Sequence, residues 1–546
     1  MDTKYIIGII AVILIAVIAG AVLFGGSSTH RADDELVVAA YSHGGEPESG
    51  FDPILGWNYL AEPLIQSTLL KMTPDMNYRN DLATNWSANS NFTEYTVNIR
   101  DGVKFTDNTT LDAEDVAFTY NMAKNNGTSD LDFGTFNNAT AVNKTTVKFY
   151  LNESDSTFVD KLAYLGIVPS DSYNNNTYGS NPVGSGPYKF VQWDKGQQVI
   201  LEKNPDYYGK QPEFKKLTIL FAQNEAAFNA AKNHEVDVAA VPLAFANETV
   251  DGYNMTLLDT IDVRGISLPV TNNTGEKIED APVGNNVTSD VAVRQALNYG
   301  INRTAIAEGA LNGIGYPNYD GIAHQLPWAN NESAIKDGNI SKAKELLNAS
   351  GWKDTNGDGI VEKNGTKASL NIYYSASAPE RQAIAVMIGE QAKEFGIEIN
   401  ATGAEWDEIY KHEYSDLVVW GYGSTDPSTL KGEYYSESFV DGTGNPGHYN
   451  SSVVDGHIQN AMKMDRNASF AEWSDVSWDG SHGTSPKGDA AWLWAGEIKY
   501  GYFVDDSLNI SEDTALSQPH GGDIFSNIYD WTRVSSINKQ NYHPMS

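Results

Sequence analysis

The chain has 546 residues, of which 71 are acidic and 37 basic, so its formal net charge is −34. With 41% hydrophobic and 20% charged residues, it has the apolar content of large packed cores and not that of a disordered protein. The acidic excess argues against nucleic acid or anionic lipid headgroups as partners, because both require a basic surface. No cysteine is present, which excludes disulfides, thiolate metal sites and a lipid-modified N-terminal cysteine.

The N-terminal segment predicts a membrane anchor. Residues 5–24 carry no charged side chain and consist mainly of Ile, Val, Ala and Leu. A helix of that length, at about 1.5 Å per residue, spans a bilayer core of about 30 Å. We expect residues 1–34 to form a transmembrane helix and a linker, with a cleaved signal peptide as the alternative. In both cases the body of the chain lies outside the cytoplasm, and with the anchor retained it is held at the cell membrane.

Asn-x-Ser/Thr triplets recur along the body, for example at Asn85, Asn247 and Asn467. Such triplets accept glycans on the surface of a secreted chain, so the body is a candidate glycoprotein. The alternative is that a chain rich in Asn and Thr forms them by chance.

The first half of the body predicts strands mixed with helices. Residues 36–40 form a short apolar run that ends in the polar loop 41–45, as a buried strand delivering a loop would. The alternating stretches 95–99 and 145–151 indicate half-buried strands, and the acidic stretch 112–115 indicates a helix start. Further strands are predicted at 199–203, 217–221 and 237–241, and a further helix at 225–232.

A polar stretch at 271–286 precedes a second block of mixed elements. Helices are predicted at 291–310, 341–350 and 379–395, and strands at 369–374 and 396–402. Strands mixed with helices of this length indicate α/β layers and not a helical bundle or a β-sandwich.

Motifs of common enzymes are missing from the sequence. It contains no Gly-x-Ser-x-Gly elbow, no phosphate-binding loop of the Walker type and no His-Glu-x-x-His. Its ten histidines include no pair four residues apart, so we do not expect a preassembled zinc site. We therefore predict that the protein is not an enzyme and has no intrinsic cofactor.

Aromatic side chains in glycine-rich or turn-like loops are candidates for lining a ligand site. The alternative for each ring is that it caps a core. The candidate ligand-binding residues are Tyr41, Trp57, Tyr59, Trp420, Tyr422 and Gly423.

Ten short segments, taken in order, resemble the extracytoplasmic solute-binding proteins of the peptide/nickel ABC importer family (family 5). Residues 100–107 are Arg-Asp-Gly-Val-Lys-Phe-Thr-Asp, and residues 184–188 are Gly-Ser-Gly-Pro-Tyr. The other segments are 52–53, 62–64, 111–118, 204–209, 235–237, 293–298, 343–347 and 351–352.

The resemblance implies an α/β, two-lobed periplasmic-binding-protein-like fold (type II, cluster C) whose hinged lobes close on a ligand. Lobe I is expected at 35–270, with an extra subdomain at about 59–193. Lobe II is expected at 271–478, and residues 479–546 are expected to return to lobe I and form a tail. The implied partners are the permease and ATPase subunits of an importer.

The resemblance also bears on the cargo. In peptide-binding members a Trp is followed three positions later by an Asp that pairs with the α-amino group of the ligand. Here Trp420 is followed by Gly423 at that position. We therefore slightly prefer nickel with a small organic chelator, or another metal chelate, as cargo. His448 and His43 are the candidate metal ligands, because one imidazole can complete a chelated Ni²⁺.

Two alternatives stay open at this point. The first is an oligopeptide- or dipeptide-binding receptor of the same family. The second is a structural or adhesion protein of the cell surface, which would share the anchor and the Asn-x-Ser/Thr triplets.

Overall fold

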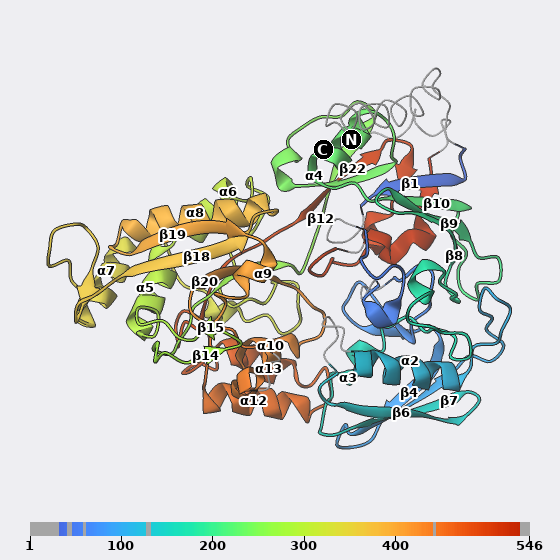
Figure 1. Ribbon diagram of the computed structural model, residues 1–546, viewed down its shortest axis with the longest axis horizontal. Coiled ribbons are helices and arrows are strands. Elements are labelled where there is room, and N and C mark those ends of the chain that lie inside the picture. The colour runs from blue at the N-terminus through green and yellow to red at the C-terminus, as the bar shows by residue number, and fades with distance from the viewer. Residues whose placement is uncertain are drawn as a thin grey trace, which may run out of the picture.

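The computed structural model describes residues 32–40, 46–57, 62–126, 133–440, 444–522 and 524–534. Its largest sheet has seven strands and forms the core of lobe I (Figure 1). In spatial order the strands are β12 (Tyr253–Leu258), β22 (Tyr500–Asp505), β11 (Val238–Val241), β1 (Glu35–Ala39), β10 (Lys216–Leu220), β9 (Gln198–Lys203) and β8 (Tyr188–Asp194). Strand β1 pairs in parallel with β10 and β11, and α4 (Asn224–Lys232) packs on β11.

A subdomain extends from lobe I. Its four-stranded antiparallel sheet has the order β4 (Ala83–Ala88), β5 (Glu94–Ile99), β7 (Thr146–Leu151) and β6 (Phe136–Asn143), and α2 (Ala113–Asn126) covers it. The core between them contains Tyr120 and Phe149, whose rings meet edge to face with centroids 4.9 Å apart. The short elements β2 (Leu70–Met72), β3 (Tyr78–Asn80) and α3 (Phe158–Lys161) lie beside it.

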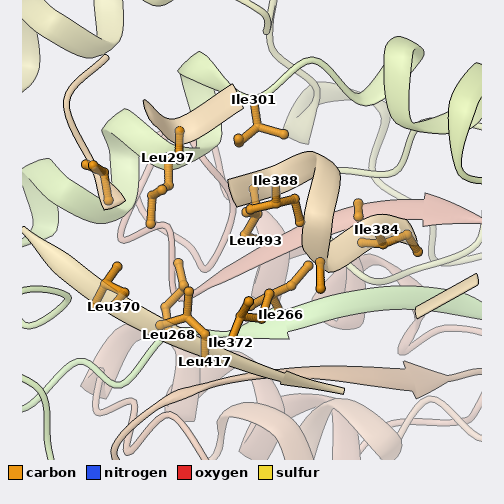
Figure 2. Close-up of a cluster of buried hydrophobic side chains, with 14 of the residues drawn as sticks. Ile266, Leu268, Leu297, Ile301, Leu370, Ile372, Ile384, Ile388, Leu417 and Leu493 are labelled. Carbon is orange, nitrogen blue, oxygen red and sulfur yellow. The ribbon is translucent and has the colours of Figure 1, made fainter. Parts of the chain in front are cut away.

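Lobe II is built on a five-stranded mixed sheet. Its order is β19 (Glu398–Ala404), β18 (Ser369–Ser375), β20 (Leu417–Tyr422), β13 (Val263–Ser267) and β21 (Trp492–Glu497). Figure 2 shows the core on one face of this sheet, where Ile266, Ile372 and Leu493 meet helix residues such as Ile388 and Leu297. The helices of this lobe are α5 (Val291–Gly300), α6 (Arg303–Gly309), α7 (Ile340–Ala349), α8 (Pro379–Lys393), α9 (Trp406–Ile409), α10 (Thr429–Tyr434), α11 (Ser436–Val440), α12 (Ser452–Met462) and α13 (Phe470–Ser477).

Helical segment 291–310 is interrupted by a cap. Asn302 has extended backbone angles, and its side-chain oxygen accepts a hydrogen bond from the amide of Ala305 at 2.9 Å, which starts α6 anew. The remaining strands form short antiparallel pairs: β14 (Lys277–Ile278) with β15 (Ala281–Pro282), β16 (Glu362–Lys363) with β17 (Thr366–Lys367), and β23 (Leu508–Asn509) with β24 (Thr532–Arg533).

The chain passes between the lobes twice, and the two passages lie side by side. The first runs from the end of β12 to the start of β13 at Val263, and the second from the end of β21 to Tyr500. The amide of Ile498 donates to the carbonyl of Asp262 at 3.0 Å, which joins the two passages. Strand pairing thus puts the crossings between the lobes near 259–262 and 498–499, whereas the expected lobe boundaries lie at 270 and 479. The boundaries differ because β13 and β21 belong to the lobe II sheet through pairing with each other, and the sequence gives no local signal of such pairing.

No helix in the described part of the chain is long and apolar enough to cross a bilayer. The predicted anchor at residues 5–24 lies outside the described residues, so the fold gives it no support. The same is true of three candidate site residues, Tyr41, His43 and Tyr59.

Candidate functional site at the interlobe crossing

A buried carboxylate organises the place where the chain crosses between the lobes. Asp262 is 0% exposed, and its Oδ1 accepts a hydrogen bond from Arg264 Nη1 at 2.6 Å. Its Oδ2 accepts from the Tyr500 hydroxyl at 2.5 Å, and His520 Nδ1 lies 2.8 Å from Oδ1. Burial alone would raise the pKa of Asp262, but the charge of Arg264 and the hydrogen bonds from His520 and Tyr500 hold this pKa below its usual range. Asp262 is therefore ionised and ties β13, β22 and the C-terminal segment together.

Two arginines line the lobe II side of this network, and sequence reasoning missed both. Arg264 Nη2 also reaches Glu380 Oε1 at 3.3 Å, and Arg381 Nη1 donates to the carbonyl of Val419 at 3.1 Å. Burial lowers the pKa of Arg381 to about 10, so it keeps its charge at neutral pH. The available signals were a charged residue inside the apolar strand 263–267 and an arginine at a helix start after Pro379.

An aromatic face lies next to these arginines. The rings of Trp420 and Trp406 stack with centroids 5.6 Å apart, and Tyr410 lies 6.4 Å from Trp420. Trp420 Nε1 donates to the Ser267 hydroxyl at 3.0 Å, which fixes the ring on the sheet. The guanidinium of Arg381 lies 5.4 Å from the Trp406 ring centroid. Trp420 was a candidate from sequence; Trp406 and Tyr410 were not, because they lie on a different, polar stretch.

Backbone atoms of neighbouring segments fill the space around Gly423. A β-carbon at this position would come within 2.5 Å of the Ile261 carbonyl oxygen and 3.0 Å of the His520 nitrogen. The carbonyl of Gly423 accepts a hydrogen bond from the same His520 amide at 2.9 Å. Residue 423 therefore has no room for a side chain, and Tyr422 beside it packs edge-on against the rings of Trp492 and Trp494.

The other two described candidates lie in cores. Trp57 is 2% exposed, its Nε1 donates to the Pro63 carbonyl at 3.1 Å, and its ring meets Phe51 in lobe I. His448 is 8% exposed and lies against Tyr414, with ring centroids 5.4 Å apart. Burial lowers the pKa of His448 to about 4, so its imidazole is neutral at pH 7. The preceding Gly447 bonds to Val270, past the end of β13 that lies away from the crossing.

A small cavity of about 20 Å³ lies below Tyr422 and Gly423, a volume sufficient for one water molecule. Glu433 lines the cavity and is 2% exposed, and its Oε2 meets no hydrogen-bond partner among the described residues. Burial raises the pKa of Glu433 well above its ordinary value, and the nearby Asp320 adds to the shift. Asp320, the other acid of this pair, is buried as well.

Acidification from pH 7.5 to 5.0 is expected to stabilise lobe II through Asp320. Burial raises the pKa of Asp320 to about 6 from 3.8, so its contribution is present below pH 3.8 and is lost as the pH rises through 6. Asp320→Asn is expected to raise the free energy of unfolding at pH 7.5 by up to about 3 kcal/mol and to flatten its pH dependence. Urea unfolding at the two pH values measures this, with the surface variant Asp171→Asn as control. An unchanged pH dependence in Asp320→Asn would contradict it.

The lobe I subdomain also touches lobe II through buried charges. Arg466, which follows α12, reaches Asp160 of α3 with Nη2 to Oδ1 at 3.0 Å and Nε to Oδ2 at 3.1 Å. Lys161 Nζ lies 3.0 Å from Asp426 Oδ2, and the amide of Ser156 donates to the Met462 carbonyl at 3.0 Å. Figure 1 shows α3 facing the α12–α13 side of lobe II. The lobes are therefore joined both at the crossing and at the subdomain.

Comparisons with known proteins place this architecture in a family. The model of the bacterial extracellular solute-binding proteins, family 5 (middle part), matches residues 77–445, so the chain belongs to this family. Protein XP55 of Streptomyces lividans is 29% identical over 440 residues, covering 78% of this chain and 77% of that protein. The oligopeptide-binding protein AppA of Bacillus subtilis is 29% identical over 405 residues, covering 68% and 72%.

The fold also matches that of a solved structure. The crystal structure of NikZ from Campylobacter jejuni in complex with Ni(L-His) matches with a TM-score of 0.75 at 22% identity, covering 92% of this chain and 100% of that one. The predicted two-lobed α/β fold is thus confirmed. The chain is an extracytoplasmic solute-binding receptor of the kind that works with the permease and ATPase of an ABC importer.

Proposed function

We propose that this receptor captures a small anionic solute between its lobes, at the face formed by Trp420, Trp406 and Arg381, and that a metal chelate is preferred over an oligopeptide. A chelator of the amino-acid or polycarboxylate type offers carboxylate oxygens to a guanidinium and flat surfaces to aromatic rings. NikZ from Campylobacter jejuni, whose fold this chain shares, is described in complex with Ni(L-His).

The observation that carries the preference is the closed environment of Gly423. A carboxylate there would be the partner of a peptide's free amino group, and backbone atoms of Ile261 and His520 occupy its place. The oligopeptide alternative draws its support from AppA of Bacillus subtilis, an oligopeptide-binding protein 29% identical to this chain. Family membership favours either receptor over a structural or adhesion protein.

His448 and His43 were proposed as metal ligands from sequence, and His520 now joins them. His520 Nδ1 faces Asp262 Oδ1 at 2.8 Å, an arrangement in which a carboxylate fixes the tautomer and orients Nε2 for a metal ion. Parallel titrations of His520→Gln, His448→Gln and His43→Gln assign the metal ligand. Only the substitution of the histidine that binds the metal is expected to lower affinity for the chelate.

Calorimetric titration of the full chain with Ni²⁺–histidine, free Ni²⁺ and mixed short peptides tests the proposed cargo. We expect heat of binding with the chelate and none with the peptides. Micromolar binding of peptides together with silence toward the chelate would reverse the preference.

Trp420→Ala is expected to weaken binding of the cargo by about 1 kcal/mol or more, because the ring loses its stacking contact with the ligand. Titration of the same chelate measures the change in Kd. Trp86→Ala is the matched control, since Trp86 is exposed on the subdomain sheet and stacks on Tyr95. An unchanged Kd in Trp420→Ala would remove this ring from the site.

We also propose that residues 5–24 tether the receptor to the membrane, which would keep it near its permease and raise its effective concentration there. The Asn-x-Ser/Thr triplets are proposed glycan acceptors on the outer surface. Alkaline extraction of membranes from the native cells tests the tether: an anchored chain stays in the pellet, and a released chain contradicts it.

A further inference from the structure

A histidine and two carboxylates converge on lobe II, away from the crossing. His457 belongs to α12, and Glu472 and Asp475 belong to α13, which packs against it (Figure 1). His457 Nδ1 lies 2.7 Å from Glu472 Oε2. One ligand atom from each of the three residues lies within 4.8 Å of the other two. A tetrahedral ion with bonds of about 2.0–2.1 Å needs its ligands roughly 3.3 Å apart, so small side-chain rotations suffice.

The opposite ring nitrogen of His457 faces another carboxylate. Its Nε2 lies 3.6 Å from Asp479 Oδ2, and Asp479 is itself held by hydrogen bonds from the amides of Ser481 and His482. A carboxylate on the second nitrogen of a histidine is the arrangement that orients metal-binding imidazoles and raises their basicity. The ring is thus presented with Nδ1 toward Glu472 and Nε2 toward Asp479.

Negative charge in this cluster is not balanced by the protein. Glu472 and Asp479 form ion pairs only with histidines, and no lysine or arginine pairs with them in the described ranges. Three carboxylates around one imidazole leave an excess that a divalent cation would remove.

His412 shows what an ordinary surface histidine in this chain looks like. It also has two acidic neighbours, but Glu408 lies 3.5 Å from Nε2 and Asp416 lies 3.0 Å from Nδ1. The two carboxylates face opposite ring nitrogens and share no point at which one ion could bind both. The cluster at His457 differs because one ligand atom from each of His457, Glu472 and Asp475 lies within 4.8 Å of the other two.

We propose that His457, Glu472 and Asp475 bind a divalent transition-metal ion of the Zn²⁺ or Ni²⁺ class, with Asp479 orienting the imidazole. One nitrogen and two carboxylate oxygens suit these ions, whereas Ca²⁺ takes oxygen ligands alone. The site is distinct from the proposed cargo site and does not depend on it. The sequence analysis did not find it because its residues are spread over 19 positions, from His457 to Asp475, and contain no histidine pair.

The bound ion would fix α12 to α13 close to the contact between the lobes. The carbonyls of Ala461 and Met462, at the end of α12, accept hydrogen bonds from Ser156 of lobe I. The site would also bind Ni²⁺ in any titration with free Ni²⁺, and the heat of that binding would be mistaken for binding of cargo. The His457→Ala background separates the two.

Titration of the metal-free full chain with ZnCl₂, in a non-chelating buffer and without histidine, tests the site. We expect one equivalent bound and a rise in the thermal midpoint. His457→Ala and the more conservative Asp475→Asn are each expected to weaken Zn²⁺ binding at least about tenfold, while His412→Ala leaves it unchanged.

Three results would overturn the proposal: no Zn²⁺ bound by the wild type, equal affinity in His457→Ala, or an equal loss in His412→Ala. Binding of Ni²⁺–histidine is measured in the same variants. It is expected to be unchanged in His457→Ala and Asp475→Asn, so a failure of the metal site and a failure of the proposed cargo give different results.

Discussion

Arg466→Met is expected to destabilise the contact between the lobes by about 3–5 kcal/mol, because it leaves a buried carboxylate without its cation. Asp160 is fully buried, and Arg466 engages both of its oxygens at 3.0 and 3.1 Å. Burial raises the pKa of Asp160 to about 6 against the opposing charge of Arg466, which shows how strongly its ionised form depends on a partner. Without that partner, opening of the lobes, which lets water reach Asp160, becomes favourable.

Urea unfolding and small-angle scattering measure the effect of Arg466→Met. Lys431→Met is the matched control, because Lys431 also reaches across the lobes, to Glu153 at 3.2 Å, but Lys431 is only half-buried and Glu153 is exposed. An exposed pair is worth at most about 1 kcal/mol. The double variant Asp160→Asn/Arg466→Met should recover part of the loss, since it leaves no buried charge unpaired. If Arg466→Met unfolds like the control, the buried pair does not hold the lobes together.

Gly423→Asp is expected to lower stability and not to create a peptide receptor. The new β-carbon would lie 2.5 Å from the Ile261 carbonyl oxygen and 2.9 Å from the Asp262 α-carbon, so backbone of the crossing must move. Overpacking of this kind costs about 1–3 kcal/mol, and the carboxylate would add charge next to the ionised Asp262. Thermal unfolding and titration with short peptides measure the two outcomes.

Gly432→Ala is the control for this substitution. Gly432 lies in α10, and a β-carbon there meets nothing within 4 Å. Alanine in a helix is favoured over glycine by up to about 1 kcal/mol, so the control should be neutral or slightly stabilising. A Gly423→Asp protein as stable as the wild type that gains affinity for peptides would contradict both the closed environment of residue 423 and the preference for a chelate.

The fold was predictable because its local patterns agree with its tertiary structure. Apolar runs such as 36–40 and 217–221 predicted β1 and β10, because a strand buried on both faces is apolar throughout. Alternating runs such as 145–151 predicted β7, because a strand buried on one face alternates between apolar and polar residues. The lobe boundaries were harder to predict from the sequence. Strand β21 joins lobe II through pairing with β13, more than two hundred residues away, and no local signal records such a partner.

The candidate site was predictable only in part. Trp420 and Gly423 stood out because they lie in a glycine-rich stretch with family resemblance. Arg381 and Asp262 did not, since their roles come from contacts between α8, β13 and the C-terminal segment. Trp57 was also a candidate because it lies in a turn-like loop, but its ring is buried in lobe I. An aromatic ring in a turn can pack in a core as well as line a ligand site.

Scattering of the full chain, with and without Ni²⁺–histidine and short peptides, tests most directly whether this protein is a two-lobed receptor that closes on its cargo. We expect a smaller radius of gyration with the solute that binds, and no such change in Trp420→Ala at a solute concentration below its raised Kd. Dimensions that stay constant with every solute that binds calorimetrically would contradict the account.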